Sequence, residues 1–233
     1  NPMKNLNLQA NILETFLSKD IAYIFDKAKS SPTYSFQAKY FQKYVGNIDA
    51  EIGTSKTPKK SRLGGYFTAK GRPTSDIWYT LQKIYAGPNF FGYYSDVNQF
   101  TSAVGFPIYK KLRGNLSYST YKTNLNKSPQ KEVATRDKYF WAGVNCYFPY
   151  NIFVVLSYNY FKSIDSLQRR GHKVDFFRTD VCKSFKKGSV QGVFEYGDYW
   201  MQYLNNNHRI WKNYEVYVNL MPNEHQSYTA YTK

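Results

Sequence analysis

The chain has 233 residues, including 24 Tyr, 17 Phe and 4 Trp, and its 32 Lys and Arg against 16 Asp and Glu give a formal net charge of +16. No stretch approaches the ~20 apolar residues of a transmembrane helix, and the mean hydropathy is −0.62. These values argue against a helical membrane protein. They allow a membrane β-barrel, in which every second residue faces a polar interior, and equally a soluble β-protein.

The basic charge allows two interpretations: an anionic partner, such as nucleic acid, lipopolysaccharide, phospholipid head groups or an acidic polysaccharide, or simply a solvated basic surface. The Lys and Arg residues are dispersed over many turns, as in 56–62 and 183–187, whereas a nucleic-acid groove gathers them on one surface. We therefore expect no nucleic-acid partner.

Apolar and polar residues alternate along most of the chain, as strands require, since successive side chains of a strand point to opposite faces. In the clearest run, Leu112, Leu116 and Tyr118 share one face, and Arg113 and Asn115 share the other. In chain order, the expected strands cover residues 5–12, 20–26, 34–40, 48–52, 63–69, 77–81, 100–106, 112–121, 139–148, 152–160, 177–181, 190–196 and 214–220.

The first part of the chain allows two interpretations. Residues 11–29 hold enough Leu, Phe and Ala for a short helix, although alternation favours strands. The opening residues contain no apolar block of a signal peptide, so an exported form is expected to be a mature protein or a fragment.

Short and long connections take turns between the expected strands, which is typical of an up-and-down meander. The sequence therefore predicts an all-β fold, an antiparallel up-and-down transmembrane β-barrel of about twelve strands. We expect residues 1–221 to form a single barrel and residues 222–233 to form a polar, strand-poor tail. Most runs approach the 9–11 residues that a tilted membrane strand needs.

Motifs of catalysis and metal binding are not found in the sequence. His172, His208 and His225 have no second ligand at metal-ligand spacing, and no nucleophile elbow or phosphate loop occurs. The two cysteines, Cys146 and Cys182, fit small hydrophobic side chains better than a disulfide. We expect no enzyme activity, no cofactor and no metal.

Charged residues on the polar faces are candidates for a lumen that contacts anions, since a charge facing lipid is costly. Arg178 and Asp180 lie two apart on one strand, and Glu195 falls on the next. Either these groups pair across strands and fill the lumen, or inward cations form a path for anions. The candidates are Lys39, Arg62, Arg113, Arg178, Asp180 and Glu195.

Apolar and aromatic residues on the opposite faces are candidates for contact with lipid or for the interfacial aromatic girdles. The same residues could instead pack across strands in a soluble sheet. The candidates are Tyr118, Phe140, Phe148, Ile152, Val154, Leu156, Tyr158, Tyr160, Phe194, Tyr196 and Trp200.

Residues 34–220 resemble bacterial outer-membrane β-barrel proteins in pattern. The stretches 86–96, 106–109 and 115–122 look like segments of large surface-export barrels. The resemblance implies an outer-membrane pore or membrane anchor within a larger envelope assembly. Two alternatives stay open: a basic barrel of the mitochondrial outer membrane, and a soluble antiparallel β-protein that binds carbohydrate or nucleic acid through Tyr, Lys and Arg.

Overall fold

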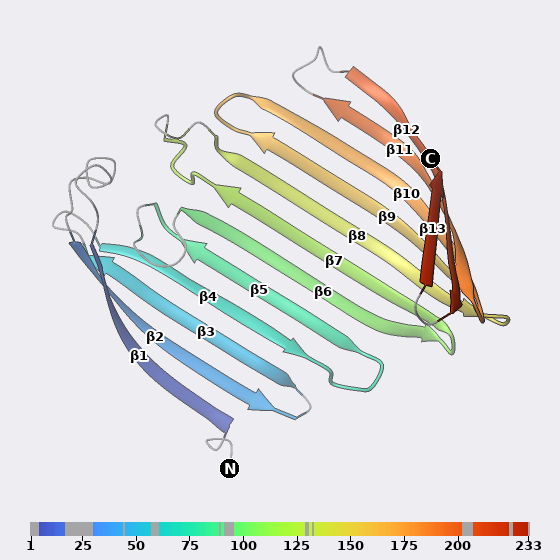
Figure 1. The fold of residues 1–233 in the computed structure, drawn as a ribbon. Coiled ribbons are helices and arrows are strands. Elements are labelled where there is room, and N and C mark those ends of the chain that lie inside the picture. The colour runs from blue at the N-terminus through green and yellow to red at the C-terminus, as the bar shows by residue number, and fades with distance from the viewer. Residues whose placement is uncertain are drawn as a thin grey trace. The chain divides into compact units, whose positions relative to one another are not determined.

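The computed structural model describes residues 5–16, 30–43, 45–56, 61–88, 90, 96–128, 131, 133–201, 207–223 and 226–232. Thirteen β-strands follow one another in a single sheet order, and each strand neighbours the strand before it in the chain (Figure 1). Their bounds are β1 Leu6–Phe16, β2 Ser30–Gln42, β3 Gly46–Lys56, β4 Ser61–Gly71, β5 Trp78–Ala86, β6 Val97–Tyr109, β7 Leu112–Thr123, β8 Thr135–Phe148, β9 Ile152–Asp165, β10 Arg170–Phe185, β11 Gly188–Met201, β12 Asn207–Asn223 and β13 Gln226–Thr232.

The predicted all-β, up-and-down architecture is confirmed, but the sheet is not closed. In the order β1 to β13 the first and last strands each have one neighbour among the described residues. No helix of the described residues is long and apolar enough to cross a membrane.

The described residues form thirteen strands, in agreement with the expected number of about twelve, and one of them lies in the tail that was expected to be strand-poor. β12 continues to Asn223, past the expected boundary at 221, and β13 at Gln226–Thr232 pairs with it. The alternating residues Tyr228, Ala230 and Thr232 form a short and largely polar run, so the composition of this segment did not predict a strand. Pairing with β12 stabilises it. The strand expected at 20–26 lies outside the described residues, while residues 11–16 belong to β1.

The chain divides into two compact units, of which the first comprises residues 1–102, 119–137 and 165–168. Within it, β1 to β5 pair antiparallel in succession. The turn between β2 and β3 ends at Gly46, whose φ of +109° is a conformation that side chains rarely adopt. A Cβ at Gly46 would also lie 2.1 Å from the Lys70 carbonyl oxygen, so this turn requires glycine.

The second unit comprises residues 103–118, 138–164 and 169–233. Here β10, β11, β12 and β13 pair antiparallel, and continuous registers join β10 to β11 and β11 to β12. The tight turn at 186–187 fixes the first of these registers, so that Phe185 lies opposite Gly188.

Little apolar surface is buried by these strands. Only six apolar residues among the described ones are buried: Ala69, Ile84, Ala86, Phe90, Ala134 and Val193. The described strands therefore bury few large apolar side chains, and most of their exposed large side chains are apolar or aromatic.

Candidate functional site

The two faces of the sheet differ in exposure. Apolar side chains are the exposed ones and polar side chains are the buried ones, which is the reverse of the arrangement in soluble proteins. In the second unit, Phe177 is 64% exposed and Tyr214 is 61% exposed on the apolar face. On the polar face, Glu195 of β11 is 6% exposed and Asn213 of β12 is 9% exposed. The apolar side chains thus face outward, and polar groups are the ones that pack together.

The first unit shows the same reversal. Phe36 and Ile52, which lie directly opposite each other on the apolar face, are 48% and 57% exposed. Thr33 and Ser55 lie directly opposite each other on the polar face and are 6% and 0% exposed. The reversal is therefore a property of both units.

A hydrogen-bonded polar-face network joins β10, β11 and β12. Arg178, Glu195 and Asn213 lie opposite one another in the register of these strands, so their side chains meet on one face. Arg178 donates from Nε and Nη2 to the two carboxylate oxygens of Asp180, at 2.8 and 2.9 Å. Its Nη1 donates to Oε1 of Glu195 at 2.9 Å, which completes a planar fork.

The network continues from Glu195 toward β12. Oε2 of Glu195 accepts hydrogen bonds from Trp211 Nε1 at 3.0 Å and from Asn213 Nδ2 at 3.1 Å. Glu215 in turn accepts from Asn213 at 2.9 Å and from Tyr217 at 2.6 Å. One Arg and three carboxylates give this network a net charge of −2.

The structure brings together three of the six predicted lumen residues, namely Arg178, Asp180 and Glu195. Lys39 is exposed and forms an ion pair with Asp49 at 3.9 Å in the first unit. Arg62 donates to the Pro88 carbonyl oxygen at 2.5 Å. Arg113 is exposed on β7 in the second unit. Arg178 and Arg62 donate hydrogen bonds to protein groups, and Lys39 and Arg113 are exposed residues.

The predicted lipid-contact residues lie on the apolar face. Aromatic neighbours follow one another across it: Phe140 and Tyr158 have ring centroids 6.3 Å apart, and Tyr158 and Phe177 have centroids 5.2 Å apart. Five of the predicted residues are exposed, namely Tyr118, Phe148, Leu156, Phe194 and Tyr196. The other six are half-buried, namely Phe140, Ile152, Val154, Tyr158, Tyr160 and Trp200.

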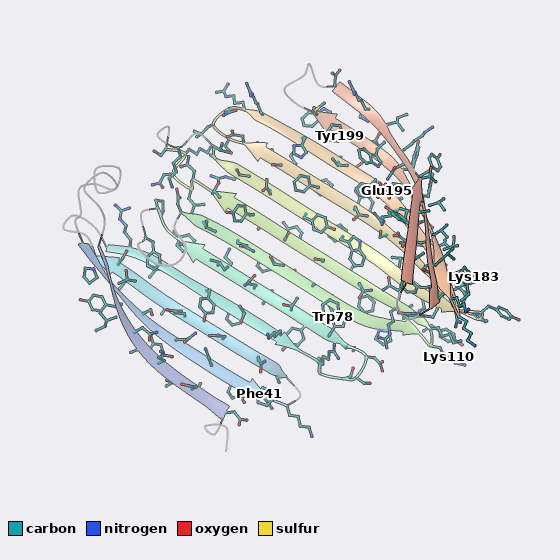
Figure 2. All side chains as sticks on the ribbon, viewed as in Figure 1. Phe41, Trp78, Lys110, Lys183, Glu195 and Tyr199 are labelled. Atoms are coloured by element: carbon teal, nitrogen blue, oxygen red, sulfur yellow. The ribbon has the colours of Figure 1, made fainter. Side chains whose placement is uncertain are left out.

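Charged residues border the apolar face of the second unit at both strand ends. At the tight-turn end lie Lys110 and Lys183 (Figure 2). At the long-loop end, a pocket of about 380 Å³ is lined by Lys162, Lys173, Asp175, Asp198, Trp200 and His208. The Lys173 ammonium also lies 5.6 Å from the ring centroid of Tyr160. Cationic and aromatic side chains thus meet where the apolar run ends.

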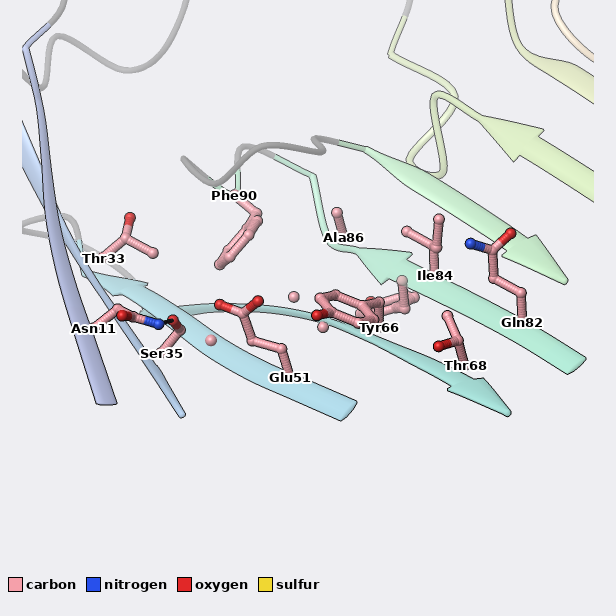
Figure 3. Close-up of a pocket in the computed structure, with 14 residues that line it drawn as sticks. Asn11, Thr33, Ser35, Glu51, Tyr66, Thr68, Gln82, Ile84, Ala86 and Phe90 are labelled. Atoms are coloured by element: carbon pink, nitrogen blue, oxygen red, sulfur yellow. Dashed lines mark hydrogen bonds between the residues drawn. The ribbon is translucent and has the colours of Figure 1, made fainter. Parts of the chain in front are cut away.

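A second candidate site is a cavity of about 500 Å³ on the polar face of β1 to β5. Phe90, from the loop after β5, covers it and is 9% exposed. Glycines leave room for that ring, since a Cβ at Gly64 would lie 2.6 Å from it. Figure 3 shows the Glu51 carboxylate directed toward Phe90, with Thr33 on one side and Tyr66 on the other.

The long loops on this unit are tied to one another by buried polar groups. Asp96 is 3% exposed, accepts a hydrogen bond from the Leu125 backbone N–H at 2.7 Å and forms an ion pair with Lys131. Asn124 is 2% exposed and closes its own loop through Ser128, whose backbone N–H donates to it at 2.8 Å. These bonds hold the loops in place beside the sheet.

Sequence reasoning missed the cavity and the residues that form it, Phe90, Thr33 and Glu51. The available signal was a concentration of glycines on adjacent strands, at 53 in β3 and at 64 and 65 in β4. Glycines inside strands often mark close approach of another group. The sequence does not indicate which group approaches these glycines, because Phe90 lies outside the strands, between β5 and β6.

The described part of the chain contains neither a cluster of metal ligands nor a disulfide. Within it, no group of three or more His, Cys, Asp or Glu side chains could hold a metal ion. Cys146 and Cys182 are both free and half-buried.

Comparisons with known proteins add no relative to this picture. No family model, no curated protein and no solved structure matches the chain.

Proposed function

We propose that the chain is a membrane-embedded antiparallel β-barrel of an outer membrane that acts as a pore or a membrane anchor. The observation that carries this proposal is the reversed exposure of the two faces, with Phe177 and Tyr214 exposed and Glu195 buried. An apolar face of this extent is unfavourable in water and favourable against lipid. The buried polar network is the usual content of a barrel interior.

The dimensions of the apolar face support the proposal. In β9 the apolar run extends from Ile152 through Leu156 to Tyr160, eight residue steps or about 27 Å along the strand. A strand tilt of about 40° reduces this to roughly 20 Å, close to the ~25 Å apolar band of membrane barrels. Lys162 and Lys173 lie beyond the run with Tyr160, the place where cationic and aromatic anchors meet lipid head groups.

The proposal requires the two free edges of the sheet to be paired. In lipid, the free edges of β1 and β13 must be paired, because unpaired backbone groups are costly there. Thirteen alternating strands run β1 and β13 in the same direction, so closure with each other would be parallel. Bacterial barrels have even strand counts and a mitochondrial barrel has 19; pairing with strands of another segment or chain is the other route.

The proposed partners follow from the charge at the rim. Phosphates of lipopolysaccharide or of anionic phospholipids complement Lys162 at one strand end, where Lys173 is already paired with Asp175 at 2.5 Å, and Lys183 at the other. An acidic polysaccharide would meet the same charges. The larger envelope assembly that the resemblance implies would also supply strands for the open edges.

Heat-dependent gel mobility tests membrane insertion. The protein is refolded in detergent and, in parallel, in buffer alone, and each sample is run with and without boiling. A compact, heat-sensitive band that forms only in detergent supports the barrel. A monodisperse, β-rich protein in plain buffer would refute it and favour the soluble alternative, a sheet that binds carbohydrate or nucleic acid.

Ion selectivity tests whether the barrel is a pore. In planar bilayers with a KCl gradient, we expect discrete conductance with a preference for anions, set by exposed cations such as Arg113. Arg113→Glu should move the reversal potential toward cations, whereas Lys110→Glu in a tight turn should leave it in place. Conductance with an unchanged reversal potential in Arg113→Glu would refute a pore-lining role for Arg113. Absence of conductance in the unsubstituted protein would refute the pore and favour a membrane anchor.

A further inference from the structure

We propose that a row of aromatic rings on the polar face of the second unit binds an acidic oligosaccharide, a short chain of sugars that carry carboxylates. This aromatic row consists of Phe161 in β9, His172 in β10 and Tyr199 in β11. Its binding of sugar depends on the second unit alone. Only its place at the mouth of a pore rests on the proposed function.

The aromatic row is continuous across neighbouring strands. The ring centroids of Phe161 and His172 are 5.2 Å apart, and those of His172 and Tyr199 are 6.3 Å apart. All three residues are half-buried, so each keeps part of its surface open. The row therefore offers an aromatic surface that extends over several strands.

The aromatic row lies on the polar face, together with the hydrogen-bonded network. Tyr199 and Glu195 are separated by an even number of residues in β11 and so share a face, as Figure 2 lets the reader follow. The same holds for His172 and Arg178 in β10, and contact with His172 places the Phe161 ring there as well. Water covers aromatic surface at such a place unless a ligand with an apolar side lies on it, and burial of that surface is favourable.

Two arginines supply positive charge beside the aromatic row. Arg209 lies directly opposite Tyr199 in the register of β11 and β12, and Arg170 precedes His172 on the same face of β10. Both are exposed, and neither forms a hydrogen bond or ion pair with a described residue. Arg178 differs, since it is held by carboxylates of the network. A guanidinium binds a carboxylate through two parallel hydrogen bonds, so Arg170 and Arg209 are available to acidic groups of a ligand.

An acidic oligosaccharide matches both features of this surface. A sugar ring has an apolar C–H face, which suits the aromatic rings, and hydroxyls at its edge, which the Tyr199 hydroxyl and the His172 imidazole can bind. From β9 to β12 the site spans three strand spacings, about 14 Å, which accommodates a trisaccharide. A single-stranded nucleic acid also combines rings with charge, but it carries a phosphate at every nucleotide and requires a basic groove along its backbone. The dispersed Lys and Arg residues of this chain do not favour such a groove.

Calorimetric titration of the full chain tests the inference, in whichever of detergent or buffer yields folded protein. The probes are trigalacturonate, the neutral trisaccharide maltotriose and a short oligothymidylate. We expect trigalacturonate to bind about tenfold more tightly than maltotriose, the effect of one charge-assisted hydrogen-bonded pair. Equal affinity for the two saccharides, tighter binding of the oligothymidylate, or no binding to folded protein would overturn the proposal. Gel mobility and conductance test the proposed function separately, so the two failures are distinguishable.

Two substitutions assign the binding to the aromatic row and its arginine. Arg209→Gln, at an exposed side chain, should bring trigalacturonate to within about twofold of maltotriose; Lys212→Gln, on the opposite face of β12, is its control. Tyr199→Ala should weaken both saccharides by about tenfold, whereas Tyr196→Ala, on the opposite face of β11, should not. A preference that survives Arg209→Gln, or unchanged binding in folded Tyr199→Ala protein, would refute the site.

Discussion

Replacing Glu195 with alanine removes the acceptor at the centre of the polar-face network. Three donors lose a bond: Arg178 at 2.9 Å, Trp211 at 3.0 Å and Asn213 at 3.1 Å. Arg178 keeps Asp180, and Trp211 is 38% exposed and can turn to water, so neither loss is complete. Asn213 is only 9% exposed.

The magnitude follows from these differences in burial. A buried donor left without its partner costs about 1–3 kcal/mol, and breaking a buried ion pair costs about 3–5 kcal/mol. Because Arg178 retains a carboxylate and is partly open to solvent, we expect Glu195→Ala to lower the free energy of unfolding by about 2–4 kcal/mol. Glu195→Gln keeps one acceptor oxygen and should cost less.

Equilibrium unfolding in guanidinium chloride, followed by tryptophan fluorescence, measures the loss. Gln191→Ala is the matched control, since Gln191 lies on the same strand and face and donates a single bond of 3.3 Å to Asp180. We expect it to cost under about 1 kcal/mol. A Glu195→Ala loss no larger than that of the control would show that the network does not hold β10, β11 and β12 together.

Two further predictions concern the apolar face and the cavity. Leu156 is 54% exposed on the apolar face, and Leu156→Arg should weaken assembly into lipid by about 2–4 kcal/mol if this face contacts the bilayer midplane. Tyr150→Arg, in a turn, is the control. Equal folding yields of the two variants in lipid vesicles would contradict lipid contact. Gly64→Ala places a Cβ 2.6 Å from the Phe90 ring and should cost about 1–3 kcal/mol in chemical denaturation. Gly192→Ala, with no described atom within 4 Å of its Cβ, should be neutral, and an equally small effect at Gly64 would mean that Phe90 does not pack there.

The sequence by itself determined the strands and their two faces. Side-chain direction in a strand depends only on the parity of the position, so the assignment of Phe194 to one face and Glu195 to the other needed no tertiary information. The meeting of Arg178 with Glu195 was also readable, because a two-residue turn at 186–187 leaves little freedom in the register.

Only the tertiary structure decided which distant segments meet. Asp96 contacts Leu125 and Lys131, which lie 29 and 35 residues further along the chain, and Phe90 folds over glycines of β3 and β4. Neither contact leaves a periodic signal, because loop conformation depends on the groups that the loop happens to reach. β13 was missed for a related reason: a short polar segment becomes a strand when a neighbouring edge, here that of β12, supplies its hydrogen bonds.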